Sequence, residues 1–432
     1  MYPLKPPRMK LLIYCLAFLT PTIGFAQKNS NNPTKLKKSA FNNALIDSFE
    51  NDIKKDIANK LISGGSYLLY EKGKIIASNT IGVTDISTKA PLKRTDIFRM
   101  ASMTKPLTSL ALLLLQEDGL INMNDRLDKY LPAFSQPIVL DQIDTLKGMI
   151  VLRTHPAKNA ILLRNLLTHT SGFASAFYPR QKALYMAALG DQDKYNLEHF
   201  ANELSKLPLD FEPGENWQYG PSINIAARVI EVVSGMSFND FLNKRIIAPM
   251  EMKDTKFYLD SVDAPRLTTL YTLDSTGSII VADAGNVSSK LISGPKLFYS
   301  GSGGINSTID DYLKFCVMIL NNGVHENKII AKPETIALMK MDQVPLNINA
   351  GFQMPSGKPY SGFTFGYQIV REEDTSWPLT KKTISWAGAY GTVFFIDPTR
   401  EAIGIYLTQN DAYIQVPSWM NFYSYMTKAL KK

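Results

Sequence analysis

Residues 103–116 form an almost uninterrupted apolar stretch that includes Leu107, Leu110 and the run 112–115. A helix over this stretch is apolar on every side, and such a helix is stable only when other protein surrounds it. The stretch therefore predicts a buried central helix, and Gly119 is a typical residue to end it. With 432 residues, the chain suits two domains, or one domain with a large insertion.

Strand-like patterns lie towards both ends of the chain. A helix-like pattern at 41–62 precedes two short apolar runs that flank Lys72-Gly73, which is a hairpin signal. Further strand-like runs and a closing helix follow near the C-terminus, at 363–370, 384–386, 392–396, 402–407 and 417–430.

Between these ends, residues 150–290 are predicted to be mostly helical with irregular connections. We therefore expect an α/β fold of the α+β type, with an antiparallel sheet flanked by helices and an inserted helical domain. The sheet part takes about 40–150 and 290–432, and the inserted part takes about 151–290.

The first 39 residues have the composition of a targeting segment and a spacer. Lys5, Arg8 and Lys10 precede a short apolar run, and small residues at 24 and 26 suit cleavage before Gln27. Residues 1–26 are thus predicted to be a signal peptide and 27–39 a flexible basic spacer. We expect a periplasmic or secreted protein with no stable membrane span after cleavage. The alternative is an uncleaved N-terminal anchor.

Charge and metal-ligand types exclude several functions. The net charge is +8, but seven of these excess positive charges lie in residues 1–39, so the nearly neutral body does not suit nucleic-acid binding. Cleavage would leave Cys316 as the only cysteine, and the four histidines are scattered. We therefore expect no disulfide, no metal and no cofactor.

A search for a nucleophile leads to Ser102. The chain has no Gly-x-Ser-x-Gly elbow, and Ser-x-x-Lys occurs at 102–105 and 293–296. Ser293 is followed by Gly and Pro, which indicates a loop. Ser102 instead precedes the apolar helix, where free N–H groups and the helix dipole favour an oxyanion. Lys105 follows one helical turn later, and burial lowers the pKa of a lysine so that it accepts a proton from serine.

Five segments together resemble the serine β-lactamase and penicillin-binding-protein-like superfamily, most closely the class C branch and its esterase relatives. They run in the family's order from about residue 60 to 410: FRMASMTK at 98–105, LLTHTSG at 166–172, PGENWQY at 213–219, GSGGINST at 301–308 and WAGAYG at 386–391. The resemblance implies one β-lactamase-like serine hydrolase domain at 40–432.

The resemblance also implies roles for particular residues. Ser102 becomes the acylated nucleophile, Lys105 its proton acceptor and Tyr219 a catalytic tyrosine whose phenolate relays protons beside a lysine ammonium. The oxyanion hole takes the backbone N–H of Ser102 and that of Ala389 or its neighbour Gly388.

Two departures from the class C pattern concern the substrate. The family's Tyr-x-Asn is replaced by Tyr219-Gly220-Pro221, which leaves Asn224 as a substitute candidate, and its Lys-Thr-Gly is replaced by Trp386-Ala387-Gly388. Without that lysine the site lacks a cation for a substrate carboxylate at this position, unless an arginine elsewhere replaces it. Trp386 offers an apolar wall instead. His169 is interpreted as a structural histidine, because a catalytic triad would need an acidic partner.

We therefore expect an exported serine hydrolase that forms an acyl-enzyme on Ser102, with a small-molecule ester or amide as its substrate. Carboxylic esters are the first substrate class. D-amino-acid peptides or β-lactams are the enzymatic alternative. A binding or scaffold protein that has lost the chemistry is the alternative of another class.

Overall fold

The computed structural model describes residues 42–146, 149–174, 181–190, 192–351, 361–373 and 378–430. The predicted signal peptide and spacer lie outside these residues. Residues Ala40–Lys432 form one unit by internal contacts. In the described part of the chain, eight antiparallel strands form the main sheet, in the order β12-β13-β14-β15-β16-β1-β2-β3.

The sheet is built from both ends of the chain, as the sequence predicts. β1 pairs with β16 in a register that places Ser66 opposite Leu407. The strands of the main sheet are β1 (Gly64–Glu71), β2 (Lys74–Asp85), β3 (Ala90–Pro91), β12 (Ser361–Phe363), β13 (Gln368–Val370), β14 (Ile384–Gly388), β15 (Thr392–Asp397) and β16 (Ala402–Leu407).

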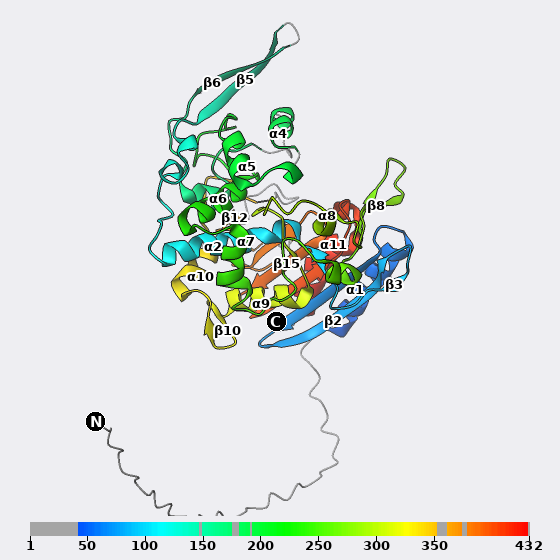
Figure 1. The fold of residues 1–432 in the computed structure, drawn as a ribbon. Coiled ribbons are helices and arrows are strands. Elements are labelled where there is room, and N and C mark those ends of the chain that lie inside the picture. The colour runs from blue at the N-terminus through cyan, green and yellow to red at the C-terminus, as the bar shows by residue number, and fades with distance from the viewer. Residues whose placement is uncertain are drawn as a thin grey trace, which may run out of the picture. The chain divides into compact units, whose positions relative to one another are not determined.

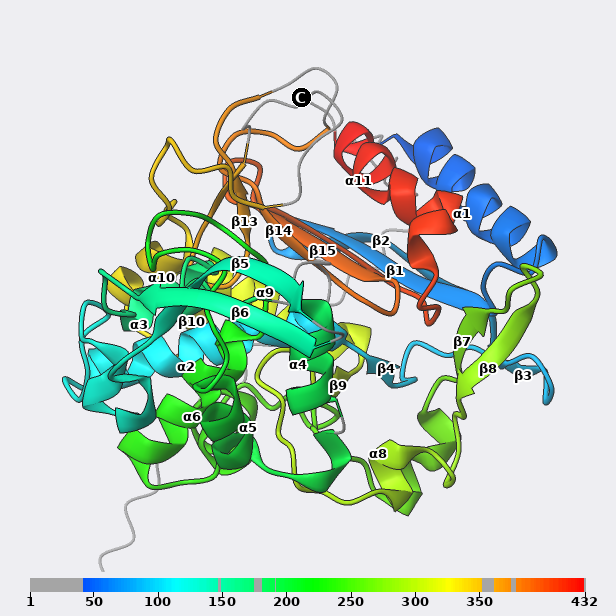
Figure 2. The ribbon, with the colours of Figure 1, turned by 90° about the horizontal axis from the view of Figure 1, so that it is seen from above.

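Helices cover both faces of this sheet (Figures 1 and 2). On one face, α1 (Asn43–Ala58) and α11 (Pro417–Ala429) pack together over Tyr67 and Leu69 of β1. The intervening Leu68 points to the opposite face and joins the larger core. This alternation along β1 is what a strand buried on both faces requires.

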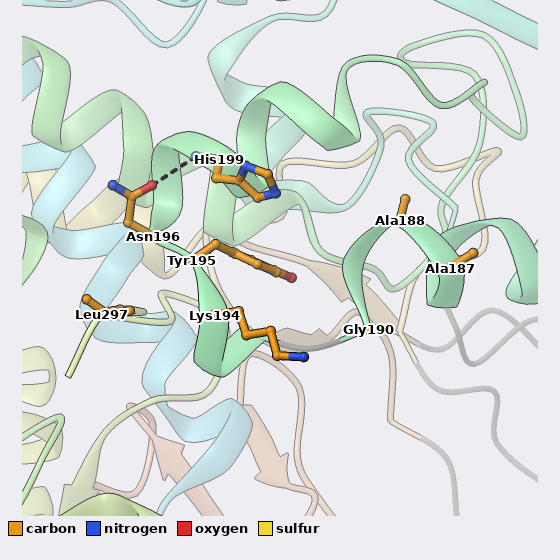
Figure 3. Close-up of a pocket in the computed structure, with 8 residues that line it drawn as sticks. All are labelled: Ala187, Ala188, Gly190, Lys194, Tyr195, Asn196, His199 and Leu297. Atoms are coloured by element: carbon orange, nitrogen blue, oxygen red, sulfur yellow. Dashed lines mark hydrogen bonds between the residues drawn. The ribbon is translucent and has the colours of Figure 1, made fainter. Parts of the chain in front are cut away.

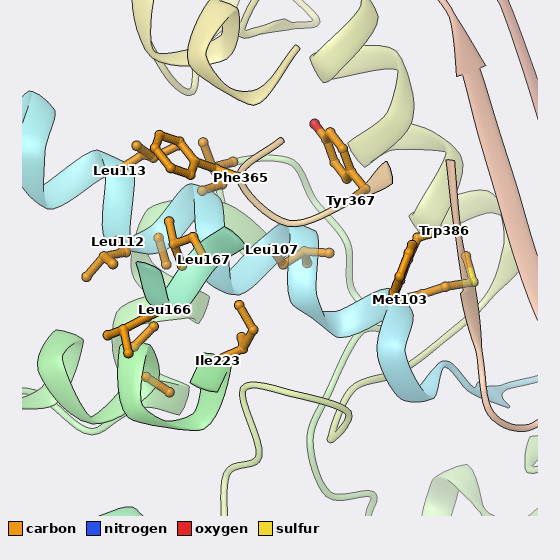
Figure 4. Close-up of a cluster of buried hydrophobic side chains, with 14 of the residues drawn as sticks. Met103, Leu107, Leu112, Leu113, Leu166, Leu167, Ile223, Phe365, Tyr367 and Trp386 are labelled. Carbon is orange, nitrogen blue, oxygen red and sulfur yellow. The ribbon is translucent and has the colours of Figure 1, made fainter. Parts of the chain in front are cut away.

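The larger core surrounds α2 (Lys105–Glu117), the predicted central helix. Every residue from Lys105 to Leu115 is buried, and Figure 4 shows Leu107, Leu112 and Leu113 of this helix among their neighbours. The other α-helices in the described residues are α3 (Leu163–Thr168), α4 (Lys182–Leu189), α5 (Leu197–Leu204), α6 (Ser222–Ser234), α7 (Phe238–Leu242), α8 (Lys290–Ser293), α9 (Ile309–Leu320) and α10 (Pro333–Met339).

The middle of the chain is less helical than its sequence suggested. Most of its helices are short, and two hairpins fall wholly or partly within it. Prolines such as Pro208, Pro213 and Pro221 interrupt the helical pattern between α5 and α6. The strands outside the main sheet pair two by two: β4 (Phe98–Arg99) with β9 (Asn306–Ser307), β5 (Ile138–Leu146) with β6 (Met149–Pro156), β7 (Leu270–Leu273) with β8 (Ile279–Asp283), and β10 (Val324–His325) with β11 (Lys328–Ile329).

The fold class expected from the sequence is confirmed: an antiparallel sheet is flanked by helices, and its two strand groups are separated by a long helix-containing segment. In the part of the chain that the structure describes, no helix combines the length and the apolar character needed to cross a membrane.

Candidate active site

Ser102 lies in a tight turn immediately before the buried helix. The turn is a 3₁₀ helix, Ala101–Thr104, and α2 begins at the next residue. Ala101 has a φ of 46°, a left-handed conformation that is strained for a residue with a side chain and that recurs at functional sites. This backbone places the partly exposed Ser102 at the mouth of α2, while Met103 on its other side is buried.

Lys105 reaches back along the helix to the serine. Its Nζ lies 3.0 Å from Ser102 Oγ and donates a second hydrogen bond of 2.7 Å to the carbonyl oxygen of Ser302. The side chain is only 3% exposed, with no carboxylate among its hydrogen-bond partners. Burial therefore lowers the pKa of Lys105 to about 7. Near neutral pH, Lys105 is then a free amine in about half of the protein molecules.

Tyr219 approaches the same oxygen from the segment before α6. Its hydroxyl donates a hydrogen bond of 2.7 Å to Ser102 Oγ, and Lys105 Nζ lies 4.6 Å from the centroid of its ring. The tyrosine ring packs against His169 at 4.7 Å and Trp386 at 5.3 Å between centroids. The structure thus brings together the three predicted catalytic side chains around one serine oxygen.

His169 supports this arrangement without touching the serine. It caps α3 in a left-handed conformation, and its Nδ1 lies 3.1 Å from Ser222 Oγ at the start of α6. Burial, with a smaller contribution from the charge of Lys105, lowers the pKa of His169 well below its usual value. In the described residues it has no hydrogen bond to Ser102. Its geometry is that of a neutral structural histidine, as its sequence context indicated.

The strand β14 passes beside the nucleophile, but its residues differ in what they reach. Ala389, just beyond its end, is exposed and lines the cavity at Ser102. Gly388 and Trp386 are buried and do not line it. A Cβ on Gly388 would overlap the Met100 carbonyl oxygen and Thr392 Oγ1, so this glycine lets β14 approach the segment before Ser102.

The sequence predicts that Trp386 forms an apolar wall of the substrate site, but in this structure the indole does not border the cavity at Ser102. The indole is 3% exposed and lies against the rings of Tyr219 and Phe363, at 5.3 and 5.2 Å between centroids. It is one of the buried side chains drawn in Figure 4. These aromatic neighbours hold Trp386 behind Tyr219, where it supports the tyrosine.

Two backbone N–H groups are available at the site. The N–H groups of Ser102 and Ala389 donate no hydrogen bond to another described residue. At the neighbouring Gly388 the carbonyl oxygen is already occupied, because it accepts a hydrogen bond from the Gly391 N–H. Both residues line the same cavity. These two N–H groups are therefore the candidates for the predicted oxyanion hole.

The cavity at Ser102 has a volume of about 580 Å³ and a mixed lining. Polar groups gather around the serine, and aromatic and aliphatic side chains form the rest. The larger apolar members include Tyr185, Met186, Leu189, Phe200, Phe257, Tyr258, Leu291 and Phe298. Ring contacts such as Phe200–Phe298, at 5.4 Å between centroids, fix this wall.

The cavity offers a substrate little positive charge. Among its described lining residues, no arginine occurs, and the cations are Lys105 and Lys290. Lys290 forms an ion pair of 2.5 Å with Asp193, which also lines the cavity. The class C pattern would place a lysine at position 386, where this chain has Trp386. No arginine among the described lining residues replaces that lysine.

A second hollow, of about 600 Å³, lies near the first (Figure 3). It shares Gly190 with the catalytic cavity and is otherwise lined by α4, α5 and the segment between them, together with Leu297. No member of the serine, lysine and tyrosine trio borders it. Among the described residues, no group of three or more His, Cys, Asp or Glu side chains is arranged to hold a metal ion.

Sequence reasoning missed two features of this site. The Ser302 carbonyl oxygen holds Lys105, although the 301–308 motif carried no role beyond its resemblance. The aromatic wall from Phe257 and Phe298 was also not predicted. A single aromatic residue in an irregular segment does not show which way its side chain points.

The fold and the trio together define a serine hydrolase with a β-lactamase/transpeptidase-like fold. A family model described as Beta-lactamase matches residues 49–416, and the chain belongs to this family. The resemblance noted in the sequence is thereby confirmed.

Similar proteins include enzymes that act on esters. Protein Rv1367c of Mycobacterium tuberculosis is 32% identical over 362 residues, 81% of this chain and 86% of its own length. Lovastatin esterase of Penicillium rubens is 26% identical over 334 residues, 73% of this chain and 80% of its own. The solved structure of EstCE1, a hydrolase with promiscuous acyltransferase activity, has a TM-score of 0.73 at 24% identity. It covers 90% of this chain and 99% of that one, and supports the fold.

Proposed function

We propose that this protein is a carboxylesterase that works through an acyl-enzyme on Ser102. The observation that carries the proposal is the contact of one serine oxygen with two proton-transfer groups, Tyr219 at 2.7 Å and Lys105 at 3.0 Å. The lowered pKa of Lys105, about 7, makes its amine a suitable base near neutral pH.

Acylation follows from this geometry. Ser102 Oγ attacks the ester carbonyl carbon while its proton passes to the neutral Lys105 amine. The N–H groups of Ser102 and Ala389 stabilise the oxyanion. The carbon–oxygen bond to the alcohol then breaks, the alcohol oxygen takes the Tyr219 proton, and Lys105 returns a proton to the tyrosine.

Deacylation uses the same groups in reverse. Water attacks the acyl carbon, and its proton passes to Tyr219 while the tyrosine's own proton passes to the neutral Lys105 amine. Lys105 then returns that proton to Ser102 Oγ as the acid leaves. The enzyme returns to its starting protonation state, so the cycle needs no metal and no cofactor.

Esters are favoured over anionic substrates by the charges in the cavity. Lys290 is paired with Asp193, and the low pKa of Lys105 leaves it only partly charged near neutral pH. A β-lactam or a D-alanyl peptide carries a carboxylate that would enter this cavity without a dedicated cation. The name of one similar protein, lovastatin esterase, supports this class.

A substrate panel tests the proposal. Values of kcat/KM are measured on one preparation for an uncharged short-chain ester, a chromogenic cephalosporin and a D-alanyl-D-alanine peptide, with Ser102→Ala as the matched control. We expect the ester to be preferred by about 10-fold or more, the factor that a missing charged hydrogen bond of about 1.5–3 kcal/mol gives. A preference for the cephalosporin or peptide supports the alternative enzyme. Absence of any Ser102-dependent turnover or labelling supports the scaffold.

We also propose export to the periplasm or the medium, from the basic start, the short apolar run and the small residues before Gln27. Mass spectrometry of the protein recovered after expression tests this. A mature N-terminus at Gln27 is expected, and a mass that retains residues 1–26 would contradict it.

A further inference from the structure

The catalytic cavity contains one polar group outside the trio whose hydrogen-bonding pattern points to the substrate. Asn224 lies in the first turn of α6, is 3% exposed and lines the cavity. Its Oδ1 accepts a hydrogen bond of 2.9 Å from the Ser302 backbone N–H and one of 3.2 Å from Ser300 Oγ.

The orientation of this amide follows from its partners. A backbone N–H donates only, so the atom facing Ser302 has to be the oxygen, and the NH₂ group has to be the other end. Within the described part of the chain, Nδ2 makes no hydrogen bond, and it is not among the polar atoms sealed from solvent. Asn224 thus presents two unused donors at the cavity.

Asn224 itself contacts the segment that joins the reacting groups to the apolar wall. The Ser302 residue that binds Asn224 through its N–H binds Lys105 Nζ through its carbonyl oxygen, at 2.7 Å. On the other side, Phe298 is two residues before Ser300, and Phe257 packs with Tyr299 at 5.5 Å between ring centroids. A bound substrate would therefore have its ester near Lys105 and an apolar group against the phenylalanines.

We infer that the site selects esters whose uncharged apolar body carries an oxygen that accepts a hydrogen bond from Asn224 near the scissile bond. An apolar substrate without that oxygen removes water from Nδ2 and leaves a buried donor unpaired, which costs binding free energy. A substrate with an ether, carbonyl or hydroxyl oxygen at this point satisfies the donor. This inference rests on the proposed esterase function and specifies its substrate class.

Matched pairs of esters test the inference. One pair, 3-methoxypropanoate and pentanoate of the same nitrophenol, replaces a methylene by an ether oxygen in the acyl part. A second pair, the acetates of 2-methoxyethanol and butanol, makes the same change in the alcohol part. The ratio of kcat/KM within each pair is measured for the wild type and for Asn224→Asp, which keeps an acceptor for Ser302 and loses the donors.

The wild-type ratio of ether to methylene should fall by roughly 2- to 12-fold in Asn224→Asp for at least one pair. This is the range that a net neutral hydrogen bond gives. Asn243→Asp, at an exposed position, is the control for added charge and should keep the wild-type ratio. Asn224→Ala should lower the ratio in the same direction, which provides a second variant in case the carboxylate impairs folding.

Unchanged ratios for both pairs in both Asn224 variants would overturn the inference, because Asn224 would then not contact the substrate. That result is distinct from failure of the proposed function, in which neither member of any pair is hydrolysed in a Ser102-dependent way. Asn243→Asp could also change the ratio of ether to methylene as much as Asn224→Asp does. The added charge would then explain the change, and the role of the amide donor would be contradicted.

Discussion

The pH dependence of ester hydrolysis should report the buried lysine directly. Lys105 is 3% exposed, and burial lowers its pKa from about 10.5 to about 7. The neutral amine accepts the serine proton, so activity requires the deprotonated form. Because the pKa is lowered, the active form is gained as pH rises through about 7 rather than through 10.5.

The size of the effect follows from that value. With a pKa of about 7, roughly one lysine in ten is neutral at pH 6, half at pH 7 and nine in ten at pH 8. We therefore expect kcat/KM to rise about tenfold between pH 6 and 8 and to be flat above about pH 8. An ordinary lysine would instead give a tenfold rise for each pH unit up to about 10.

The assay is initial-rate hydrolysis of an uncharged ester, followed by pH-stat titration or at a wavelength where the product's absorbance does not change with pH. Lys105→Arg is the control, since a guanidinium stays protonated over this range and should lose both the rate and the inflection. A wild-type rate that keeps rising tenfold per unit between pH 8 and 10, or that is flat from pH 5 to 8, would refute the reasoning.

Three substitutions test the rest of the site. Tyr219→Phe removes the donor to the leaving group and should lower kcat by about 10²- to 10⁴-fold in steady-state assays, and retention of most activity would exclude the proton-transfer role. Gly388→Ala should destabilise the protein by about 1–3 kcal/mol and lower kcat, because its methyl group would overlap Met100 and push β14 from the nucleophile. Trp386→Ala should cost about 3–5 kcal/mol in denaturant unfolding, since the indole is buried against Tyr219; a loss below 1 kcal/mol would contradict that packing.

The sequence predicted the features that depend on local periodicity. The apolar run at 103–116 corresponds to α2, and the strand-like runs at 384–386, 392–396 and 402–407 correspond to β14, β15 and β16. The three-residue spacing of Ser102 and Lys105 predicted a common helical face, and their polar atoms are 3.0 Å apart.

Features that depend on long-range packing were harder to predict. Tyr219 reaches Ser102 from 117 positions away, and only the resemblance to a family suggested this contact. The direction of Trp386 depends on where Tyr219 and Phe363 pack, so its position in a motif did not show that it is buried.

The hairpin of β5 and β6 illustrates a different omission. Its strands flank Lys147-Gly148, a dipeptide like the Lys72-Gly73 that correctly indicated the hairpin of β1 and β2. Acidic and basic residues along both strands, such as Asp144 and Arg153, interrupt the apolar alternation that marks a half-buried strand. The two form an ion pair of 2.8 Å, whereas Val139 and Leu140, nearer the start of β5, are buried.

The most direct test of the account is to locate the covalent adduct that a fluorophosphonate forms with the protein. The probe reacts with a serine that a neighbouring base activates, and peptide mass spectrometry identifies the modified residue. We expect one adduct on Ser102, formed faster as pH rises from 6 to 8, and none in Ser102→Ala. An unmodified wild-type protein, or an adduct on another residue that persists in Ser102→Ala, would contradict the claim that Ser102 is the nucleophile.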